Sequence, residues 1–329
     1  MQGILQTVNR LAAASQIALL DQGRWEEATC PICPSGIESV PFLTCSDRLR
    51  EPQLRNYQLL RCTGCGLIYL SPRPVSSTAG EFYRDEGYDP FLSVHAPRGL
   101  LDRIYAILRR GTLKWKKRLI DRRTGARARI LDIGCGTGEF LAILGKDYRV
   151  EGIEPAPEAA RWARERLGLK VHTGSLDDVE FSRDRFDMIT LWHVLEHLPE
   201  PSRELEKIHR LLADDGRLLI ALPNIRSLDS RIYRSHWVAL DAPRHLWHFS
   251  KPQLELLMHK SGFEITESGM LPLDTFYNSL YSEINLKQAG GNLQLILSPV
   301  RLTITTAASL VWGAVSGQHS GMYYILRKS

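Results

Sequence analysis

The segment Arg129–Gly138 constrains this chain of 329 residues more than any other. It is a short apolar run that carries one acid, Asp132, and an apolar stripe begins just after it at Phe140. Three glycines stand between the two at alternating positions: Gly134, Gly136 and Gly138. The pattern predicts a strand, a tight turn and a helix. Because glycine has no Cβ and the first turn of a helix has free N–H groups, we expect a ligand to lie against this turn, although an ordinary strand-to-helix turn has the same local pattern.

The next predicted strand, Val150–Ile153, ends in Glu154, where a carboxylate can accept hydrogen bonds from a ribose diol. A dinucleotide-binding turn has the spacing G-x-G-x-x-G, whereas the glycines here alternate as G-x-G-x-G. On these residues the chain resembles the class I S-adenosylmethionine-dependent methyltransferases, whose first motif is similar to Leu131–Gly138 and whose second motif ends in an acid such as Glu154. The resemblance extends to Gly269 and resumes at a last strand near Met322.

This resemblance implies an α/β fold with a Rossmann-like, mostly parallel sheet, an antiparallel last strand and S-adenosylmethionine as the cofactor. In the family an acid after the third strand contacts the adenine amino group. Here Ser175 stands at the usual acidic position, and the nearby Asp177 is the candidate. The expected cofactor-binding residues are Asp132, Gly134, Gly136, Gly138, Glu154, Asp177 and Trp192.

Four of the six cysteines form two C-x-x-C pairs. The first pair is Cys30 and Cys33, the second is Cys62 and Cys65, and 28 residues separate them. Four thiolates satisfy tetrahedral zinc without an open position, so we expect a structural zinc ribbon; unliganded or redox thiols are the alternative. This cysteine usage, with no recognisable secretory signal, favours a reducing compartment and hence the cytoplasm.

The chain divides into four predicted parts. These are an N-terminal helix (1–28), the zinc ribbon (29–75), a linker (76–128) and the methyltransferase domain (129–329). The net charge of +5 is mild, but the window Arg98–Arg129 holds twelve Lys or Arg against two Asp. Apolar residues recur there at helical spacing, which predicts a basic amphipathic helix. A solvated linker helix, contact with anionic lipid or a phosphorylated substrate, and contact with RNA all fit this pattern.

A buried fourth strand, Phe186–Leu191, leads into the motif Trp-His-Val-Leu-Glu-His-Leu. The motif resembles the loop after the fourth strand in the group that includes the quinone-biosynthesis O-methyltransferases. Ligands of open parallel sheets bind outside the carboxyl ends of the strands, so we expect Trp192, His193 and His197 at the crevice. An oxygen acceptor of high pKa needs a base, and histidine is suited to that role near neutral pH. The candidate bases are His193, His197 and His245, although each could instead cap a turn or pack in the core.

Two inserts interrupt the predicted domain. The insert Pro223–Phe249 is rich in groups that bind or titrate, and it predicts a substrate loop that uses Trp237, Arg244 and His248. The insert 271–320 contains the apolar segment Leu293–Gly317, whose only charge is Arg301. A single membrane crossing there would put the last two strands on opposite sides of a bilayer. We therefore expect a packed helical lid, a dimer surface or an element lying in one leaflet.

The sequence thus predicts methyl transfer to a small-molecule acceptor that is glycosyl, quinone-like or lipid-linked, with O-methylation favoured. The partners expected are this acceptor, the inner face of a membrane and a second copy of the chain. RNA methylation is the alternative within enzymes, but no recognised base-stacking motif accompanies the basic helix. A non-catalytic scaffold that binds the cofactor is the third hypothesis, and the glycine turn beside a histidine-rich crevice disfavours it.

Overall fold

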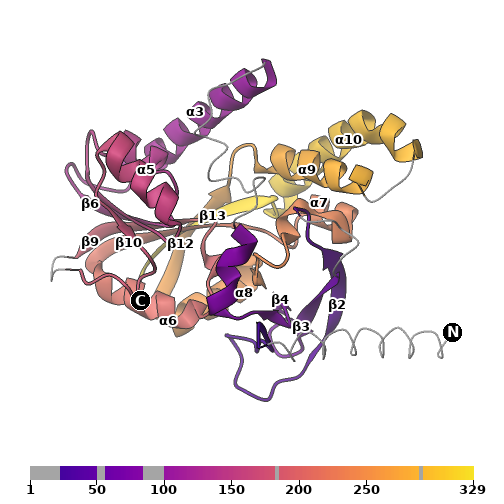
Figure 1. Ribbon diagram of the computed structural model, residues 1–329, viewed down its shortest axis with the longest axis horizontal. Coiled ribbons are helices and arrows are strands. Elements are labelled where there is room, and N and C mark those ends of the chain that lie inside the picture. Colours follow the sequence, from indigo (N-terminus) through magenta and orange to yellow (C-terminus); the bar gives the residue numbers. More distant parts are fainter. Residues whose placement is uncertain (1–22, 50–55, 84–99, 182–184, 289–291) are drawn as a thin grey trace.

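The computed structural model describes residues 23–49, 56–83, 100–181, 185–288 and 292–329. Within them a large sheet flanked by helices stands next to a smaller sheet built mainly from the N-terminal part of the chain (Figure 1).

The large sheet has seven strands in the order β12-β13-β10-β9-β6-β7-β8. Its strands are β6 (Arg129–Ile133), β7 (Arg149–Glu154), β8 (Val171–Thr173), β9 (Phe186–Trp192), β10 (Leu212–Pro223), β12 (Phe263–Met270) and β13 (Gly321–Lys328). All run parallel except β13, which is antiparallel to both β10 and β12. This confirms the predicted Rossmann-like sheet with an antiparallel last strand.

Helices connect these strands. They are α3 (Leu100–Asp121), α4 (Glu139–Leu144), α5 (Pro157–Leu167), α6 (Pro201–Leu211) and α8 (Lys251–Lys260). The central strands are apolar on both faces because helices cover both faces: in β9, for example, Met188, Ile189 and Leu191 are fully buried. The helix predicted after the glycine turn is α4, and the predicted basic helix is α3.

The small sheet joins segments that are distant in sequence. Its order is β11-β4-β3-β2, with β2 (Ser39–Ser46), β3 (Asn56–Cys62), β4 (Ile68–Leu70) and β11 (Trp247–His248). The first three strands come from the cysteine-containing segment, whereas β11 comes from the insert of the methyltransferase domain. The insert also forms α7 (Leu228–Tyr233), η4 (Arg234–His236) and η5 (Val238–Leu240). The ribbon and the insert are therefore one packed unit.

The N-terminal helix predicted for 1–28 falls largely outside the described residues. Within that range, Trp25–Glu26 forms strand β1. Strand β1 pairs with β5 (Arg73–Pro74), and the short helices α2 (Ser76–Ala79) and η1 (Gly80–Tyr83) follow.

The apolar insert is a pair of packed helices, α9 (Asp274–Gln288) and α10 (Asn292–Ser316). Arg301 of α10 donates to the buried carboxylate of Glu283 on α9 at 2.6 Å. Figure 1 shows the pair beside α7 at one end of the large sheet. Among the described helices, none is both long enough and apolar enough to cross a bilayer.

Candidate active site

The glycine turn connects β6 to α4 at the carboxyl edge of the large sheet. All three glycines have a positive φ, between +56° and +79°. A Cβ on Gly134 would lie 2.5 Å from a methyl carbon of Val194, so close packing also requires glycine there. At Gly136, in contrast, a Cβ would meet nothing within 4 Å. The backbone of Gly136 thus faces open space, as a turn that receives a ligand must.

Glu154, at the end of β7, is coupled to this turn. Its Oε2 accepts the amide N–H of Gly136 at 2.8 Å, and its Oε1 accepts that of Ala156 at 2.9 Å. Burial raises the pKa of Glu154, and the two amide bonds oppose that rise. Each carboxylate oxygen keeps a further lone pair, so the group can still accept bonds from a ribose diol. The acid and the turn predicted from the sequence are therefore brought together.

A second acid, Asp132, lies on β6 below the turn. It is buried, and Thr190 of β9 donates to it at 2.5 Å. Burial raises the pKa of Asp132 to about 7, against the opposing effects of Thr190 and Lys116. Lys116 of α3 is the nearby cation, and burial lowers its pKa to about 8. Lys116 does not stand out in the sequence because it is one of many basic residues in its window.

Trp192 ends β9 and forms a wall of this region. Its ring packs edge-on against Phe140 and Trp115, and the ammonium of Lys116 lies 4.1 Å above it. The indole Nε1 is buried and has no hydrogen-bond partner among the described residues. A buried donor without an acceptor is rare in folded proteins, so this atom marks a place where a ligand atom is expected. The open backbone at Gly136, the Glu154 carboxylate and this free donor together fit an adenosyl cofactor.

Asp177, the predicted adenine contact, lies beside α6. The Oδ1 atom of its carboxylate forms ion pairs with Lys207 at 2.7 Å and Arg203 at 3.2 Å, both on that helix. These cations lower its pKa, with the Lys207 contact the largest cause. The side chain is 47% exposed, and its role in cofactor binding stays a prediction. The neighbouring turn is held by Asp178, which accepts from the amide and hydroxyl of Ser175 at 2.7 Å.

The three candidate bases are not equivalent. His193 has an exposed side-chain fraction of 39%, the positive φ of +56°, and a carboxylate near each ring nitrogen. Its Nδ1 lies 3.3 Å from Glu196, and its Nε2 lies 3.5 Å from Asp274 at the start of α9. Burial opposes the charge of this ring, but Asp274 and Glu196 outweigh it and raise the pKa of His193 to about 9. Asp274 could not be predicted as a partner of His193, because it lies 82 residues after the end of β9 and no local pattern links the two.

His197 and His245 face each other below this position, with ring centroids 4.5 Å apart. The Nδ1 of His197 lies 3.0 Å from the carbonyl oxygen of Arg244 and 3.1 Å from the hydroxyl of Tyr83. Burial, reinforced by His245, lowers the pKa of His197 to about 4. The Nδ1 of His245 bonds to the carbonyl oxygen of Ala239 at 2.8 Å. His245 is buried and His197 is half-buried, and a backbone carbonyl oxygen occupies the Nδ1 atom of each ring.

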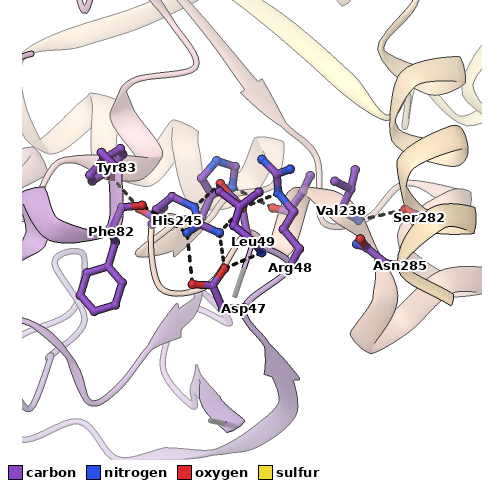
Figure 2. A network of polar contacts seen from close by, with 12 residues as sticks. Asp47, Arg48, Leu49, Phe82, Tyr83, Val238, His245, Ser282 and Asn285 are labelled. Carbon is purple, nitrogen blue, oxygen red and sulfur yellow. Dashed lines mark hydrogen bonds and ion pairs between the residues drawn. The ribbon is translucent and has the colours of Figure 1, made fainter. Parts of the chain in front are cut away.

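Two of the predicted substrate residues, Trp237 and Arg244, have buried side chains. The Nε1 of Trp237 donates to Asp229 at 2.8 Å, and the Arg244 side chain has no exposed surface. Figure 2 shows Asp47 and Arg48 converging on this part of the insert. Arg244 binds Asp47 at 2.6 Å and Asp241 at 2.8 Å, and Arg48 adds a second cation to Asp241 at 2.6 Å.

All donors of Arg244 are used inside the protein, so none is left for a substrate. The third predicted residue, His248, is only 4% exposed and lies in β11. The ring of His248 is therefore buried in the small sheet and does not lie on an open loop. The insert positions the ribbon against the core, and the polar groups that suggested a binding loop form that contact.

The four ribbon cysteines converge on one point. Their sulfur atoms all lie within 4.8 Å of one another, and those of Cys30 and Cys65 are 3.5 Å apart. Sulfurs bound to one tetrahedral zinc at about 2.3 Å have this kind of spacing. A Cβ on Gly64 would lie 3.0 Å from the sulfur of Cys33, so the knuckle needs glycine at that position. The cluster fits a structural zinc ion held by Cys30, Cys33, Cys62 and Cys65.

Proteins of similar sequence are methyltransferases, in agreement with a site that fits an adenosyl cofactor. A family model described as a methyltransferase domain matches residues 107–268. The ubiquinone biosynthesis O-methyltransferase of Azorhizobium caulinodans is 31% identical over 158 residues, covering 44% of this chain and 62% of that protein. The protein of the same name from Xanthomonas oryzae pv. oryzae (strain PXO99A) is 30% identical over 162 residues, covering 44% of this chain and 67% of that protein. The match thus spans a little less than two thirds of the first relative's length.

Among solved structures, magnesium protoporphyrin IX methyltransferase from Synechocystis PCC 6803, determined with bound SAH, superposes with a TM-score of 0.50. The match covers 77% of this chain and 99% of that one at 12% identity, so it concerns the fold. The glycine turn, the sheet order and the curated relatives agree, and the chain belongs to the class I S-adenosylmethionine-dependent methyltransferases.

Proposed function

We propose that this protein transfers a methyl group from S-adenosylmethionine to an oxygen of a small-molecule acceptor. One observation carries the proposal: the open Gly136 turn and the partly exposed His193 follow the adjacent strands β6 and β9 at the same edge of the sheet. A donor that lies against the turn presents its sulfonium toward the crevice, where an acceptor can be aligned for in-line attack.

His193 is the member of the predicted base set that this geometry favours. Its ring is partly exposed, and Glu196 and Asp274 hold it from two sides. His193 is protonated near neutral pH while Asp274 and Glu196 both pair with it, because they raise its pKa to about 9. An acceptor hydroxyl that enters between Nε2 and Asp274 would replace that carboxylate as the partner of the ring, and losing this ion pair lowers the pKa of His193 toward the range in which the neutral ring acts as a base. His197 and His245 are disfavoured because their Nδ1 atoms bond to backbone carbonyls in the interior.

The acceptor class follows from the relatives' names and from the surroundings of His193. Both curated relatives are named for O-methylation in ubiquinone biosynthesis, which supports a quinone-like acceptor. Two apolar residues at the start of the helix that carries Asp274 are each 42% exposed: Leu273 just before the helix and Phe276 within it. Apolar groups beside the crevice suit an oily acceptor better than RNA. Glycosyl and lipid-linked acceptors belong to the same proposal.

Radiolabelled methyl transfer tests this function. The full chain is incubated with labelled donor and with lipid, metabolite and RNA fractions, and then with hydroxylated aromatic acceptors. We expect label in a small-molecule or lipid product. Label in RNA alone would contradict the proposal, and binding of the donor without any transfer would favour the non-catalytic scaffold.

The base is tested with His193→Ala, His197→Ala and His245→Ala beside a control, His259→Ala, at an exposed histidine of α8. We expect His193→Ala to lower kcat by about 10² to 10⁴ and to leave donor affinity nearly unchanged. Equal losses in all variants, accompanied by unfolding, would show only a structural requirement.

We also propose that the protein contacts an anionic lipid surface, because two exposed stripes support this. One stripe is apolar and lies within one face of α10, where the side chains are between 57% and 83% exposed: Val300, Ile304, Val311 and Val315. The other stripe is basic and lies on α3, where exposed cations follow one another at intervals of four: Arg110, Lys114 and Arg118. Apolar insertion and attraction to anionic lipid act together at membrane surfaces.

A further inference from the structure

A second group of potential metal ligands lies apart from the cysteines. A carboxylate oxygen of Glu196 and one ring nitrogen each of His197 and His245 all lie within 4.8 Å of one another. Glu196 and His197 belong to the 3-10 turn η3 (Leu195–His197) after β9, whereas His245 comes from the insert. Glu196 is fully buried and His245 is 8% exposed. Two chain segments about 50 residues apart thus converge on one buried point.

The hydrogen bonds of the two histidines fix which nitrogen is available. The Nδ1 of His197 faces the carbonyl oxygen of Arg244, and that of His245 faces the carbonyl oxygen of Ala239, at 3.0 and 2.8 Å. A carbonyl oxygen only accepts, so both Nδ1 atoms carry the proton and donate it. In a neutral ring the lone pair then resides on Nε2. Histidines that ligate metals are commonly oriented by such a bond from the other nitrogen.

Two buried polar atoms at this place have no hydrogen-bond partner among the described residues. They are the Oε2 of Glu196 and the Nε2 of His248. His248 adjoins the group, with its ring 6.4 Å from that of His245. A carboxylate oxygen that is buried without a donor or a cation costs considerable free energy. A cation bound by Glu196 would remove that cost.

We propose that Glu196, His197 and His245 bind a divalent transition-metal ion. Two imidazoles and one carboxylate suit zinc, iron, manganese or nickel, whereas magnesium and calcium prefer sites made of oxygen alone. Three protein ligands leave at least one coordination position open, unlike the four-cysteine site.

The proposed ion would also connect to the crevice. Glu196 binds the Nδ1 of His193 through Oε1 at 3.3 Å, so one carboxylate would join the metal to the partly exposed histidine. His193 would then orient Glu196 by a hydrogen bond, as residues next to a metal ligand commonly do. The metal site does not depend on methyl transfer, because its ligands and its free atoms are defined by the interior contacts alone.

Cobalt substitution separates the two metal sites. Protein prepared with Co²⁺ as the only added metal should bind two ions per chain by elemental analysis. The cysteine site should give thiolate-to-cobalt charge-transfer bands in the near ultraviolet, and the second site should give only weak visible bands without them. One ion per chain with a purely thiolate spectrum would overturn the proposal.

Glu196→Gln keeps the shape of the side chain and removes its charge. We expect this variant to lose one ion and the weak visible bands while it keeps the charge-transfer bands, whose presence also reports that the ribbon is folded. His259→Ala, the exposed control, should keep both ions. If Glu196→Gln retained two ions, the carboxylate would not be a ligand. If Glu196→Gln failed to fold, the stoichiometry and spectrum of the unaltered protein would still decide the question.

The alternative without a metal is that the ion pair between Glu196 and the charged ring of His193 is enough to hold the buried carboxylate, and it predicts one ion per chain. Because the readout is metal content and not activity, loss of this proposal leaves the methyltransferase proposal intact. Absence of methyl transfer likewise says nothing against the metal site.

Discussion

At the scale of single residues, Asp132 is a buried acid beside the glycine turn whose charge state changes near neutral pH. Its folded pKa of about 7 lies above the usual value of 3.8 because burial disfavours the ionised form. Between these two pH values the folded protein binds more protons at this position than the unfolded chain does. The free energy of unfolding should therefore fall as the pH rises through that window.

We predict that Asp132→Asn removes this pH dependence in the cofactor-free protein. The variant should become more stable than the original chain above pH 7, on the order of 1 kcal/mol or more, while it binds the donor more weakly. Urea unfolding at pH 5 and pH 8 measures the first effect, and calorimetry measures the second. Parallel pH profiles for the two proteins would show that Asp132 is ionised in the folded state.

Some single residues were accessible from the sequence and others were not. The turn at Gly134–Gly138 and the acid Glu154 were found because their signal is local: glycines between an apolar strand and an apolar helix, and an acid at a strand end. The interior roles of Trp237 and Arg244 were not. Arg244 is satisfied by Asp47, 197 residues away, and no local pattern reveals such a partner.

At the scale of elements, the buried ion network holds the insert to the segment that follows β2 of the ribbon. Arg244 has no exposed side-chain surface and bridges Asp47 and Asp241. We predict that Arg244→Met lowers the free energy of unfolding by about 3 to 5 kcal/mol, because it leaves buried carboxylates with too few cations. Urea unfolding measures the loss.

The matched control for this prediction is Arg327→Ala. Arg327 pairs with Glu264 on the surface of the large sheet, where both side chains are more than half exposed. Such a pair contributes about 0 to 1 kcal/mol. Equal losses for Arg244→Met and Arg327→Ala would mean that the buried network contributes no more than an ordinary surface pair.

The order of strands and helices was predictable because the central strands β6, β9 and β10 each contain a short apolar run that is followed by a turn. The pairing of β11 with β4 was not, because β11 has only two residues and its partner strand lies about 180 residues earlier. The insert therefore looked like a long polar loop. The insert is long and polar, as its sequence indicates, but its polar groups bond to one another and to the ribbon.

At the scale of the whole molecule, the ribbon and the methyltransferase core share contacts beyond that sheet. Gln253 of α8 donates to the carbonyl oxygen of Cys65 at 2.7 Å, and Lys260 of the same helix donates to that of Ile32. A zinc ion at the cysteines would thus hold in place the two ribbon carbonyl groups that accept these bonds from α8 of the core.

We predict that Cys62→Ser, which removes a ligand to this ion, destabilises the whole chain in one cooperative transition. A structural zinc site can contribute about 10 kcal/mol to folding, so the variant should melt well below the original protein. Differential scanning calorimetry with zinc present tests this, and Cys45→Ser, at a buried cysteine outside the cluster, is the control. Two separate transitions, with only one shifted, would show that ribbon and core unfold independently.

The surface as a whole presents an apolar stripe on α10 and a basic stripe on α3, and Figure 1 shows both helices projecting on the same side of the large sheet. If this side contacts lipid, the two stripes should contribute differently. Apolar insertion operates on any bilayer, whereas the attraction of Arg110 and Lys114 requires anionic lipid and weakens with salt.

We therefore predict that the protein floats with liposomes that contain anionic lipid and less well with neutral ones. Val311→Glu with Val315→Glu should abolish flotation in both cases, whereas Arg110→Glu with Lys114→Glu should abolish only the anionic excess. Leu256→Glu, at an exposed apolar residue of α8, is the control and should float normally. Failure of the unaltered protein to float on either lipid contradicts the prediction. If it instead forms a dimer in light scattering that Val311→Glu converts to a monomer, the apolar stripe joins two copies of the chain, because the same exposed valines cannot lie in a bilayer and in a dimer interface at once.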